Sequence, residues 1–274
     1  MDLQLIPRGP LRLFVQRLWF SEGAPLGTER ERVLPTGAMH LAIRLDDEPL
    51  HIYASVEAAT GQAIGTAVIG GARAEAYVRD VSRPVRSVGA MLAPGASLPL
   101  FGVPADELAH RHTALADVWG REVDGIRDRL RGLDSPRAQL IAFEAILAAR
   151  LPRIRGIHPA VAHALGRFDA SCDVRSVVDE VGYSHHRFIT LFREAVGLTP
   201  KRYCRVLRFH RAVERLGTEP AVPWSELALE AGYSDQAHFV REFHALSGVT
   251  PTTFRKLAPR HAHHVPVQFP SRRG

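Results

Sequence analysis

The sequence contains little cysteine and no long apolar run. Cys172 and Cys204 are the only cysteines among 274 residues. Two cysteines cannot make a disulfide framework, and we expect each to fill space as a small side chain in a reducing cytosol. No apolar stretch approaches the roughly 18 residues that span a membrane. Residues 1–4 do not start the basic region and apolar core of a signal peptide, so we expect no signal peptide. We expect a cytoplasmic protein without membrane attachment.

The sequence also lacks the residue patterns of common catalytic and metal sites. No Ser, His and Asp stand in a recognisable nucleophile elbow. The Gly70–Arg73 stretch has no phosphate-loop Lys and does not open a helix, so it predicts a hairpin turn. No cysteine or carboxylate lies at metal-ligand spacing from the histidines that could start a metal site, which are His40, His51, His261, His263 and His264. We therefore expect no enzymatic activity, no cofactor and no metal.

Charge is unevenly distributed along the chain. Residues 1–150 contain 17 Arg and 18 Asp or Glu, a net charge of −1. Because the whole chain has a net charge of +6, residues 151–274 have a net charge of +7. Positive charge gathered on one part of a chain is typical of a protein that binds a polyanion. A solvated basic surface would give the same count, so the charge has weight only together with the pattern found in the same residues.

Residues 1–150 predict a β-rich domain with a helical end. Short runs with Val, Ile and Tyr, separated by Gly, Pro and Asp, predict strands at 40–45, 51–55, 67–69, 75–79 and 86–92. A helix is expected to start at Pro104, and the apolar period predicts another over 115–133. Ser135 and Pro136 predict the capped start of a third helix, which runs to about Arg150.

The remainder of the chain predicts a linker, a helical domain and a tail. Residues 151–157 have the composition of an interdomain linker, and residues 158–258 have an all-helical pattern. Residues 259–274 are rich in His, Pro and Arg without periodicity, so we expect a disordered tail. The predicted fold class is thus α+β with two domains, a β-rich, barrel-like N-terminal domain with helices and an all-α C-terminal domain.

Two stretches of the C-terminal domain are copies of each other. Gly-Tyr-Ser, two Phe, Gly and Thr-Pro recur in the same order at 182–200 and 232–251, with one residue inserted in the second copy. Such a repeat is one supersecondary unit used twice. Each unit predicts a helix, a tight Gly turn and a second helix, which is the helix-turn-helix pattern. One such unit would fit any helical bundle, but two on a basic domain favour sequence-specific binding of double-stranded DNA.

The second helix of each copy predicts one buried and one exposed face. In the first copy Phe188 and Phe192 lie on the apolar stripe, and His186, Thr190 and Arg193 lie opposite, with Ile189 beside them. In the second copy Phe239, Phe243 and Leu246 form the stripe, and Ala237, Val240, Arg241 and His244 point outward, flanked by Gln236 and His238. Such an exposed face fits a major groove, where Arg241 suits guanine, Gln236 suits adenine, and Ile189 and Val240 suit thymine methyl groups.

Each copy ends in Thr-Pro, which predicts the start of another helix at Thr199 and at Thr250. The backbone N–H groups at such starts bind phosphates well. Apolar residues along the helix from Pro200 predict a stiff connection between the copies, so the pair could enter grooves about 34 Å apart. The candidate phosphate contacts are Ser184, Arg187, Arg193, Lys201, Arg202, Arg205, His244 and Lys256.

At these residues the sequence resembles the AraC/XylS family of bacterial transcription regulators. The segments GYSDQAHFVREFHALSGVTP and DEVGYSHHRFITLFREAVGLTP are similar to the family's two motif signatures, and the resemblance covers about His158 to Leu257. It implies two helix-turn-helix units on one seven-helix domain that reads adjacent major grooves. The family's base-reading positions correspond to His186, Ile189, Thr190, Gln236, His238 and Arg241. Pro223 departs from the usual polar cap, and Val178 from the usual small Ala.

The N-terminal part is similar to a poorly characterised domain that is often fused to such DNA-binding units. The similarity rests on Trp19 and on the short motifs at 35–37, 93–95, 103–108 and 117–120. It implies a β-barrel-like sensor or dimerisation domain followed by helices. Pro35-Thr36-Gly37 departs from a commoner Pro-Asp-Gly, which leaves a ligand role at this position open.

The sequence therefore predicts a transcription regulator whose residues 1–150 sense an effector or self-associate. The further partners are a small-molecule effector, a second copy bound through the helices at 115–150, and RNA polymerase if the protein is an activator. Those helices could equally pack on their own domain. The rival hypotheses are an enzyme in the N-terminal half and an architectural protein that binds DNA regardless of sequence. Effector, operator, and activation or repression stay open.

Overall fold

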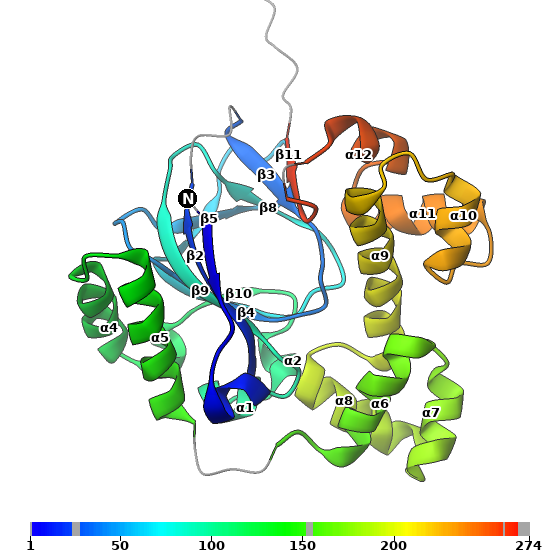
Figure 1. The fold of residues 1–274 in the computed structure, drawn as a ribbon, viewed down its shortest axis with the longest axis horizontal. Helices are drawn as coiled ribbons and strands as arrows, with labels where there is room; N and C mark the ends of the chain where they lie inside the picture. Colours follow the sequence, from blue (N-terminus) through cyan, green and yellow to red (C-terminus); the bar gives the residue numbers. More distant parts are fainter. Residues whose placement is uncertain (1, 24–27, 152–155, 260, 268–274) are drawn as a thin grey trace, which may run out of the picture.

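The computed structural model describes residues 2–23, 28–151, 156–259 and 261–267, and Figure 1 shows their arrangement. A β-rich N-terminal part and a helical C-terminal part lie beside each other, as expected. The strands are β1 (Asp2–Leu5), β2 (Val15–Glu22), β3 (Arg30–Val33), β4 (His40–Arg44), β5 (Leu50–Tyr53), β6 (Gln62–Gly65), β7 (Ala67–Gly70), β8 (Tyr77–Asp80), β9 (Arg86–Leu92), β10 (His112–Ala114) and β11 (His264–Pro266).

The helices of the N-terminal part are short, except for the last. They are the 3-10 helix η1 (Gly9–Leu13), α1 (Ser97–Phe101), α2 (Ala105–Leu108), α3 (Ala116–Trp119), α4 (Glu122–Arg131) and α5 (Pro136–Arg150). The single helix predicted over 115–133 is wrong in its continuity, because Gly120 with φ +73° separates α3 from α4. The prediction for α5 is confirmed, and the Ser135 side chain accepts a hydrogen bond from Ala138 N.

The strands form two antiparallel sheets, ordered β1-β2-β9-β4-β7-β10 and β11-β3-β8-β5-β6. The β-rich prediction is confirmed, but the sheets stay open and do not close into a barrel. The predicted hairpin turn at Gly70–Arg73 is wrong, because the chain crosses there from β7 in one sheet to β8 in the other. Gly71 is required at this crossing, since a Cβ on it would lie 1.7 Å from the carbonyl oxygen of Leu108.

The core of the N-terminal part lies between the sheets and under α5. Leu18 and Phe20 of β2 and Leu41 and Ile43 of β4 are buried at alternate positions, as expected for strands with one face on the core. Helix α5 contacts β1, β2 and β9. It thus covers its own sheet, which is the alternative to a dimer through these helices, and self-association stays a prediction.

The C-terminal part consists of α6 (Pro159–Ala170), α7 (Val174–Val181), α8 (His185–Val196), α9 (Pro200–Thr218), α10 (Trp224–Glu230), α11 (Gln236–Ser247) and α12 (Pro251–Leu257). Helix α9 runs between the group α6–α8 and the group α10–α12 (Figure 1). The α6–α8 group has a hydrophobic cluster of its own, whereas the buried residues of α10–α12 belong to the same cluster as the N-terminal core.

Part of the predicted disordered tail is a strand. Residues 264–266 form β11, which pairs antiparallel with β3 so that Val265 lies opposite Arg32. Val265 is buried, and His264 Nδ1 lies 2.8 Å from the carboxylate of Glu31. The prediction of disorder is therefore wrong for these residues, because pairing with β3 and burial of Val265 order them. The predicted linker and tail also include residues 152–155, 260 and 268–274, which lie outside the described residues.

Two features are absent from the described residues. No helix among them is long and apolar enough to cross a membrane. No group of three or more His, Cys, Asp or Glu side chains in the same ranges is arranged to hold a metal ion.

Candidate nucleic-acid interface

The first helix-turn-helix unit is built from α7 and α8. Asp173 caps α7, since its carboxylate accepts hydrogen bonds from the backbone N–H groups of Arg175 and Ser176 at 3.1 and 3.2 Å. Gly182 ends α7 with φ +69°, a conformation that most side chains resist. Ser184 then caps α8 by accepting from Arg187 N at 3.3 Å. The predicted Gly turn is confirmed, and together with the two caps it fixes the angle at which α8 leaves the turn.

Helix α8 is held by aromatic packing on one side and is exposed on the other. Phe188 and Phe192 are fully buried, and Phe192 packs edge-on against Phe168 of α6 and Tyr203 of α9, with ring centroids 5.7 and 5.6 Å apart. The candidate reading residues lie on the opposite side, with His186 exposed and Ile189 and Thr190 half-buried. The side chain of Thr190 donates a hydrogen bond to the backbone carbonyl of His186 at 3.1 Å.

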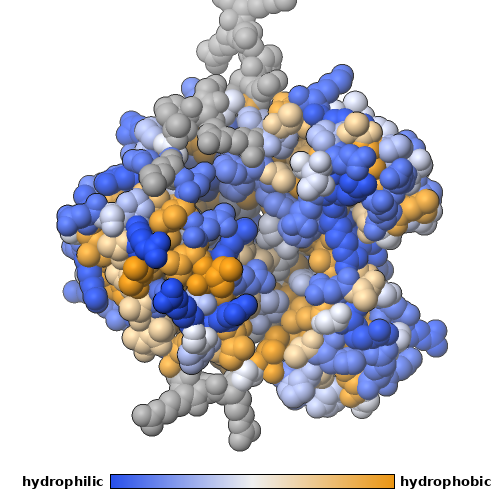
Figure 2. Space-filling model, in the orientation of Figure 1, coloured by the Kyte–Doolittle hydropathy of each residue, from blue (hydrophilic) through white to orange (hydrophobic). Residues whose placement is uncertain are grey.

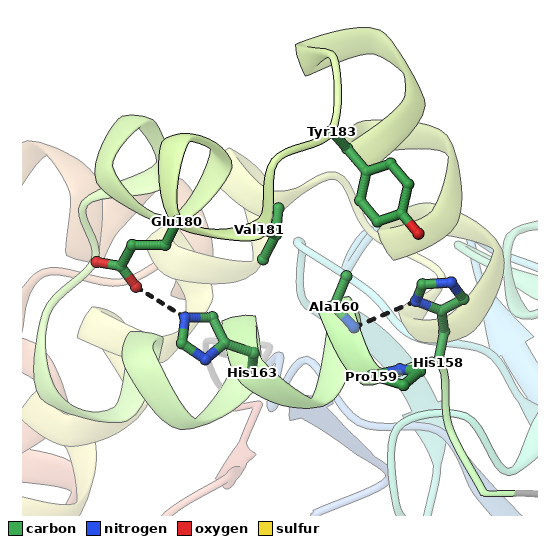
Figure 3. Close-up of a pocket in the computed structure, with 7 residues that line it drawn as sticks. All are labelled: His158, Pro159, Ala160, His163, Glu180, Val181 and Tyr183. Atoms are coloured by element: carbon green, nitrogen blue, oxygen red, sulfur yellow. Dashed lines mark hydrogen bonds and ion pairs between the residues drawn. The ribbon is translucent and has the colours of Figure 1, made fainter.

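An open groove of about 420 Å³ lies beside this unit, between α6 and the α7–α8 turn (Figure 3). The ring of Tyr183 at the turn lies 5.8 Å from that of His158. Glu180 accepts hydrogen bonds from His163 and Arg167 of α6 at 2.7 and 2.9 Å. The hydrogen bonds from His163, Arg167 and Ser176 lower the pKa of Glu180 to about 2. The groove is thus bordered by an ion pair that ties α7 to α6.

The second unit is built from α10 and α11 in the same way. Gly232, with φ +87°, makes the turn between them. Helix α11 is capped by Asp235, whose carboxylate accepts from His238 N at 2.7 Å and from the Ser234 hydroxyl at 2.9 Å. Sequence reasoning missed this cap. The residue inserted in the second copy moves the cap from the Ser of Gly-Tyr-Ser to the following Asp, and Asp is itself a preferred N-cap residue.

Helix α11 also buries one face and exposes the other. Phe239, Phe243 and Leu246 are fully buried, and the Phe243 ring lies 5.1 Å from Phe209 of α9 and 5.5 Å from Phe254 of α12. On the opposite side Gln236, Arg241 and His244 are exposed and His238 is half-buried. The structure thus brings all six candidate base-reading residues onto the outer sides of two matching helices.

Helix α9 fixes the two units relative to each other. Thr199 caps it by accepting from Arg202 N at 3.4 Å, and Thr250 caps α12 by accepting from Thr253 N at 3.1 Å, as predicted. Figure 2 shows the two units as separate lobes with a notch between them, mainly hydrophilic on this face. Because α9 packs Tyr203 against the first lobe and Phe209 against the second, neither lobe can turn without disturbing packed rings.

The candidate phosphate contacts divide into two groups. Ser184, Arg187, Lys201, Arg202, His244 and Lys256 are exposed. Two arginines are instead in ion pairs, Arg205 with Glu242 of α11 at 2.5 Å and Arg193 with Asp106 of α2 at 3.0 Å. Sequence reasoning missed both acidic partners. Asp106 lies 87 residues from Arg193 and in the other part of the chain.

The C-terminal end of α8 is in close contact with the N-terminal part. The backbone N–H of Gly95 donates to the carbonyl of Ala195 at 2.8 Å. A Cβ on Gly197, which has φ +87°, would lie 3.0 Å from the Cβ of Ala72 and 3.1 Å from the carbonyl oxygen of Ala105. Together with the Arg193–Asp106 pair, these contacts fasten the first candidate reading helix to α2 and to the loop before α1.

Family models match both parts of the chain. Residues 177–257 match a helix-turn-helix domain, and residues 3–114 match a domain of unknown function, DUF6597. The HTH-type transcriptional regulator AlkR of Acinetobacter baylyi is 27% identical over 138 residues, which are 49% of this chain and 40% of AlkR. The chain thus matches less than half the length of this relative.

Solved structures resemble the chain over one or both parts. ToxT from Vibrio cholerae O395, bound to (E)-4-(8-methylnaphthalen-1-yl)but-3-enoic acid, has a TM-score of 0.50 at 10% identity, over 88% of this chain and 98% of ToxT. This likeness shows a shared fold across both parts. The C-terminal domain of AraT from Geobacillus stearothermophilus covers 36% of this chain and 86% of its own, at 23% identity and a TM-score of 0.35. The C-terminal part of the chain is thus a helix-turn-helix domain, similar to part of an HTH-type transcriptional regulator.

Proposed function

We propose that the chain regulates transcription by binding specific duplex sequences, with α8 and α11 in adjacent major grooves. The observation that carries the proposal is the pair of matching units on α9, each of which turns the polar side of its second helix outward. An α-helix fits the width of a major groove, and its exposed side chains can then reach base edges. The base-reading residues would be His186, Ile189 and Thr190 on α8 and Gln236, His238 and Arg241 on α11.

The chemistry of these side chains suggests unequal roles for the two helices. Arg241 and Gln236 are exposed and could form the bidentate contacts that distinguish guanine and adenine. The α8 set contains no Arg or Gln, and Ile189 offers an apolar contact of the kind that suits a thymine methyl group. We therefore expect α11 to contribute most of the hydrogen-bonded base recognition and α8 to contribute shape and apolar contacts.

Phosphate contacts would hold the chain in register on the duplex. Lys201 and Arg202 are exposed at the start of α9, where a capped helix N-terminus presents backbone N–H groups. Lys256 is exposed in the last turn of α12. Arg187, Ser184 and His244 would add contacts beside the reading residues. Arg193 and Arg205 would first have to leave Asp106 and Glu242, so their contribution depends on a rearrangement.

The N-terminal domain would modulate DNA binding through its contact with α8. A ligand that binds one arrangement of α2 and α8 better than another shifts the population toward it, and DNA affinity follows. Support comes from the close packing of Gly197 on Ala72 and Ala105. ToxT, which shares the fold, binds a small carboxylic acid in the structure described above. A small-molecule effector is therefore the kind of ligand that we propose for this domain.

The proposal is tested by selecting duplexes from a random-sequence pool with the full chain and then measuring variants on the selected duplex. Arg241→Ala should cost about 1–3 kcal/mol of binding free energy and relax the preference at one base pair. Arg129→Ala, which removes an exposed arginine from α4, is the matched control and should leave affinity nearly unchanged. If no sequence is enriched, or if Arg241→Ala weakens selected and random duplexes equally, the proposal is wrong.

A further inference from the structure

The two cysteines of the chain lie against each other inside the first helix-turn-helix unit. Cys172 is in the loop between α6 and α7, and Cys204 is in the first turns of α9. The Cys172 thiol donates to the carbonyl oxygens of Phe168 and Cys204, each at 3.8 Å. The fold thus brings together two thiols that are 32 residues apart in the sequence.

The surroundings make the two thiols chemically different. Cys172 is half-buried, so small solutes can reach it, whereas Cys204 is buried. The neighbouring Cys204 side chain and the charges of Arg211 and Arg208 lower the pKa of Cys172 to about 7. The Arg211 guanidinium is held there by hydrogen bonds to the carbonyls of Phe168 and Asp169 at 2.9 and 2.7 Å. A thiolate is the reactive form of cysteine, and positive neighbours favour it.

An accessible thiol of low pKa beside a second thiol is the arrangement found at redox-sensing cysteines. None of the proposed DNA contacts involves these two cysteines, and neither belongs to the hydrophobic cluster of the second unit. Simple filling of space requires only that both side chains be small and apolar, and it does not account for a half-exposed thiol beside two arginines. The pairing therefore calls for a chemical role in addition to packing.

We propose that Cys172 and Cys204 are a redox site at which a hydroperoxide forms a disulfide within the first helix-turn-helix unit. The Cys172 thiolate attacks one oxygen of the peroxide, the O–O bond breaks, and hydroxide leaves, which yields a sulfenic acid on Cys172. The Cys204 thiol then attacks this sulfur, the S–S bond forms, the S–O bond breaks, and the departing hydroxide takes the thiol proton as water. With hydrogen peroxide, two thiols lose two electrons and the peroxide becomes two waters.

The disulfide would act on the packing beneath α8. Cys204 belongs to the same buried cluster as Phe168, Phe188 and Phe192, and Cys172 immediately precedes Asp173, the cap of α7. Bonding the sulfurs joins the α6–α7 loop to α9 covalently and shifts a buried side chain of that cluster. The second unit, whose core belongs to the other cluster, should be unaffected.

The test oxidises the reduced full chain with hydrogen peroxide and follows its intact mass, its free thiols and its hydrogen exchange. The expected product has lost two hydrogens, has no free thiol, and yields a peptide with Cys172 bonded to Cys204. Dithiothreitol should restore both thiols. Hydrogen exchange should change several-fold in α6–α8 and not in α10–α12.

Two variants separate the steps. Cys204→Ser should stop at a sulfenic acid on Cys172 that dimedone traps, and Cys172→Ser should stay reduced under the same treatment. Three outcomes would each overturn the proposal. The chain without substitutions could gain the mass of oxygen and form no disulfide, or form a disulfide only between molecules. Cys204 could also be oxidised faster than Cys172. None of these readouts involves DNA, so the result is independent of the proposed function.

Discussion

At the residue scale, partly buried imidazoles make the stability of the fold depend on pH. Burial lowers the pKa of His40 to about 4, of His112 to about 2 and of His263 to about 3. The guanidinium of Arg73 donates to His112 Nδ1 at 2.9 Å, a contact that only the unprotonated nitrogen can accept. In the unfolded chain a histidine titrates near pH 6.5. Below that pH the unfolded state binds more protons than the folded state.

The sign of the pH dependence follows from these pKa values. Stability from neutral burial is complete above about pH 6.5 and is lost as the pH falls toward the folded-state values. We expect the free energy of unfolding in urea to be lower at pH 5 than at pH 7.5, by up to about 2 kcal/mol for each imidazole. In the His112→Phe variant, the free energies of unfolding at pH 5 and at pH 7.5 should differ by less than in the unsubstituted chain. An equal difference in the variant would show that His112 is not responsible.

Residues with local roles could be predicted from the sequence, and residues with distant partners could not. Gly182, Thr199 and Thr250 act on the backbone within a few positions, so residue type and spacing were enough to predict their roles. The partners of Arg193 and Arg205 depend on how whole helices pack, and a single sequence does not contain that information. The six candidate reading residues follow from the helical period, but the bases that they contact remain a prediction.

At the scale of elements, strands marked by their own residues were predicted, and strands that depend on distant partners were not. Strands β4, β5, β7, β8 and β9 were expected close to their observed bounds, because Val, Ile and Tyr are concentrated in them. Strand β2 was missed, since its polar residues and its irregular pairing near Val15 and Arg17 obscure the alternation. Strand β11 was missed because three residues form a strand only through β3, more than 200 positions earlier.

Also at this scale, the contact of α2 with α8 predicts the effect of one substitution. Asp106→Asn keeps the size of the side chain but removes the charge that holds Arg193 at 3.0 Å. Arg193 is half-exposed, so the ion pair contributes at most about 1 kcal/mol. We expect Asp106→Asn to raise affinity for a selected duplex up to about fivefold, as measured by fluorescence anisotropy at low salt.

Arg193→Ala is the companion variant for this prediction. It breaks the same ion pair but also removes the positive charge, so it should not raise affinity for the duplex. Equal gains in the two variants would mean that only the loss of the contact matters, and that Arg193 does not approach the DNA backbone. A lower affinity in Asp106→Asn would show that this contact supports the arrangement of α8 that binds DNA.

At the scale of the whole molecule, the two units are attached differently to the N-terminal domain. The buried residues of α10–α12 share one hydrophobic cluster with that domain, while those of α6–α8 form a separate cluster. The first unit is therefore connected to the rest of the chain through α9 and through the contacts of α8 with α2 and with the loop before α1. A change in the N-terminal domain would reach the first unit by shifting α8, whereas the second unit would move only with the shared core.

This arrangement makes the spacing of the DNA site a test of the whole molecule. Because α9 packs against both units through Phe209 and Tyr203, the units cannot follow half-sites that rotate apart. Inserting about five base pairs, half a helical turn, between the half-sites of a selected duplex should lower affinity on the order of 100-fold. An insertion of a full turn, about ten base pairs, restores the face of the duplex but lengthens the span, so it should not rescue binding. Rescue by the full turn would show that the units move independently and that α9 does not hold the two reading helices at a fixed distance.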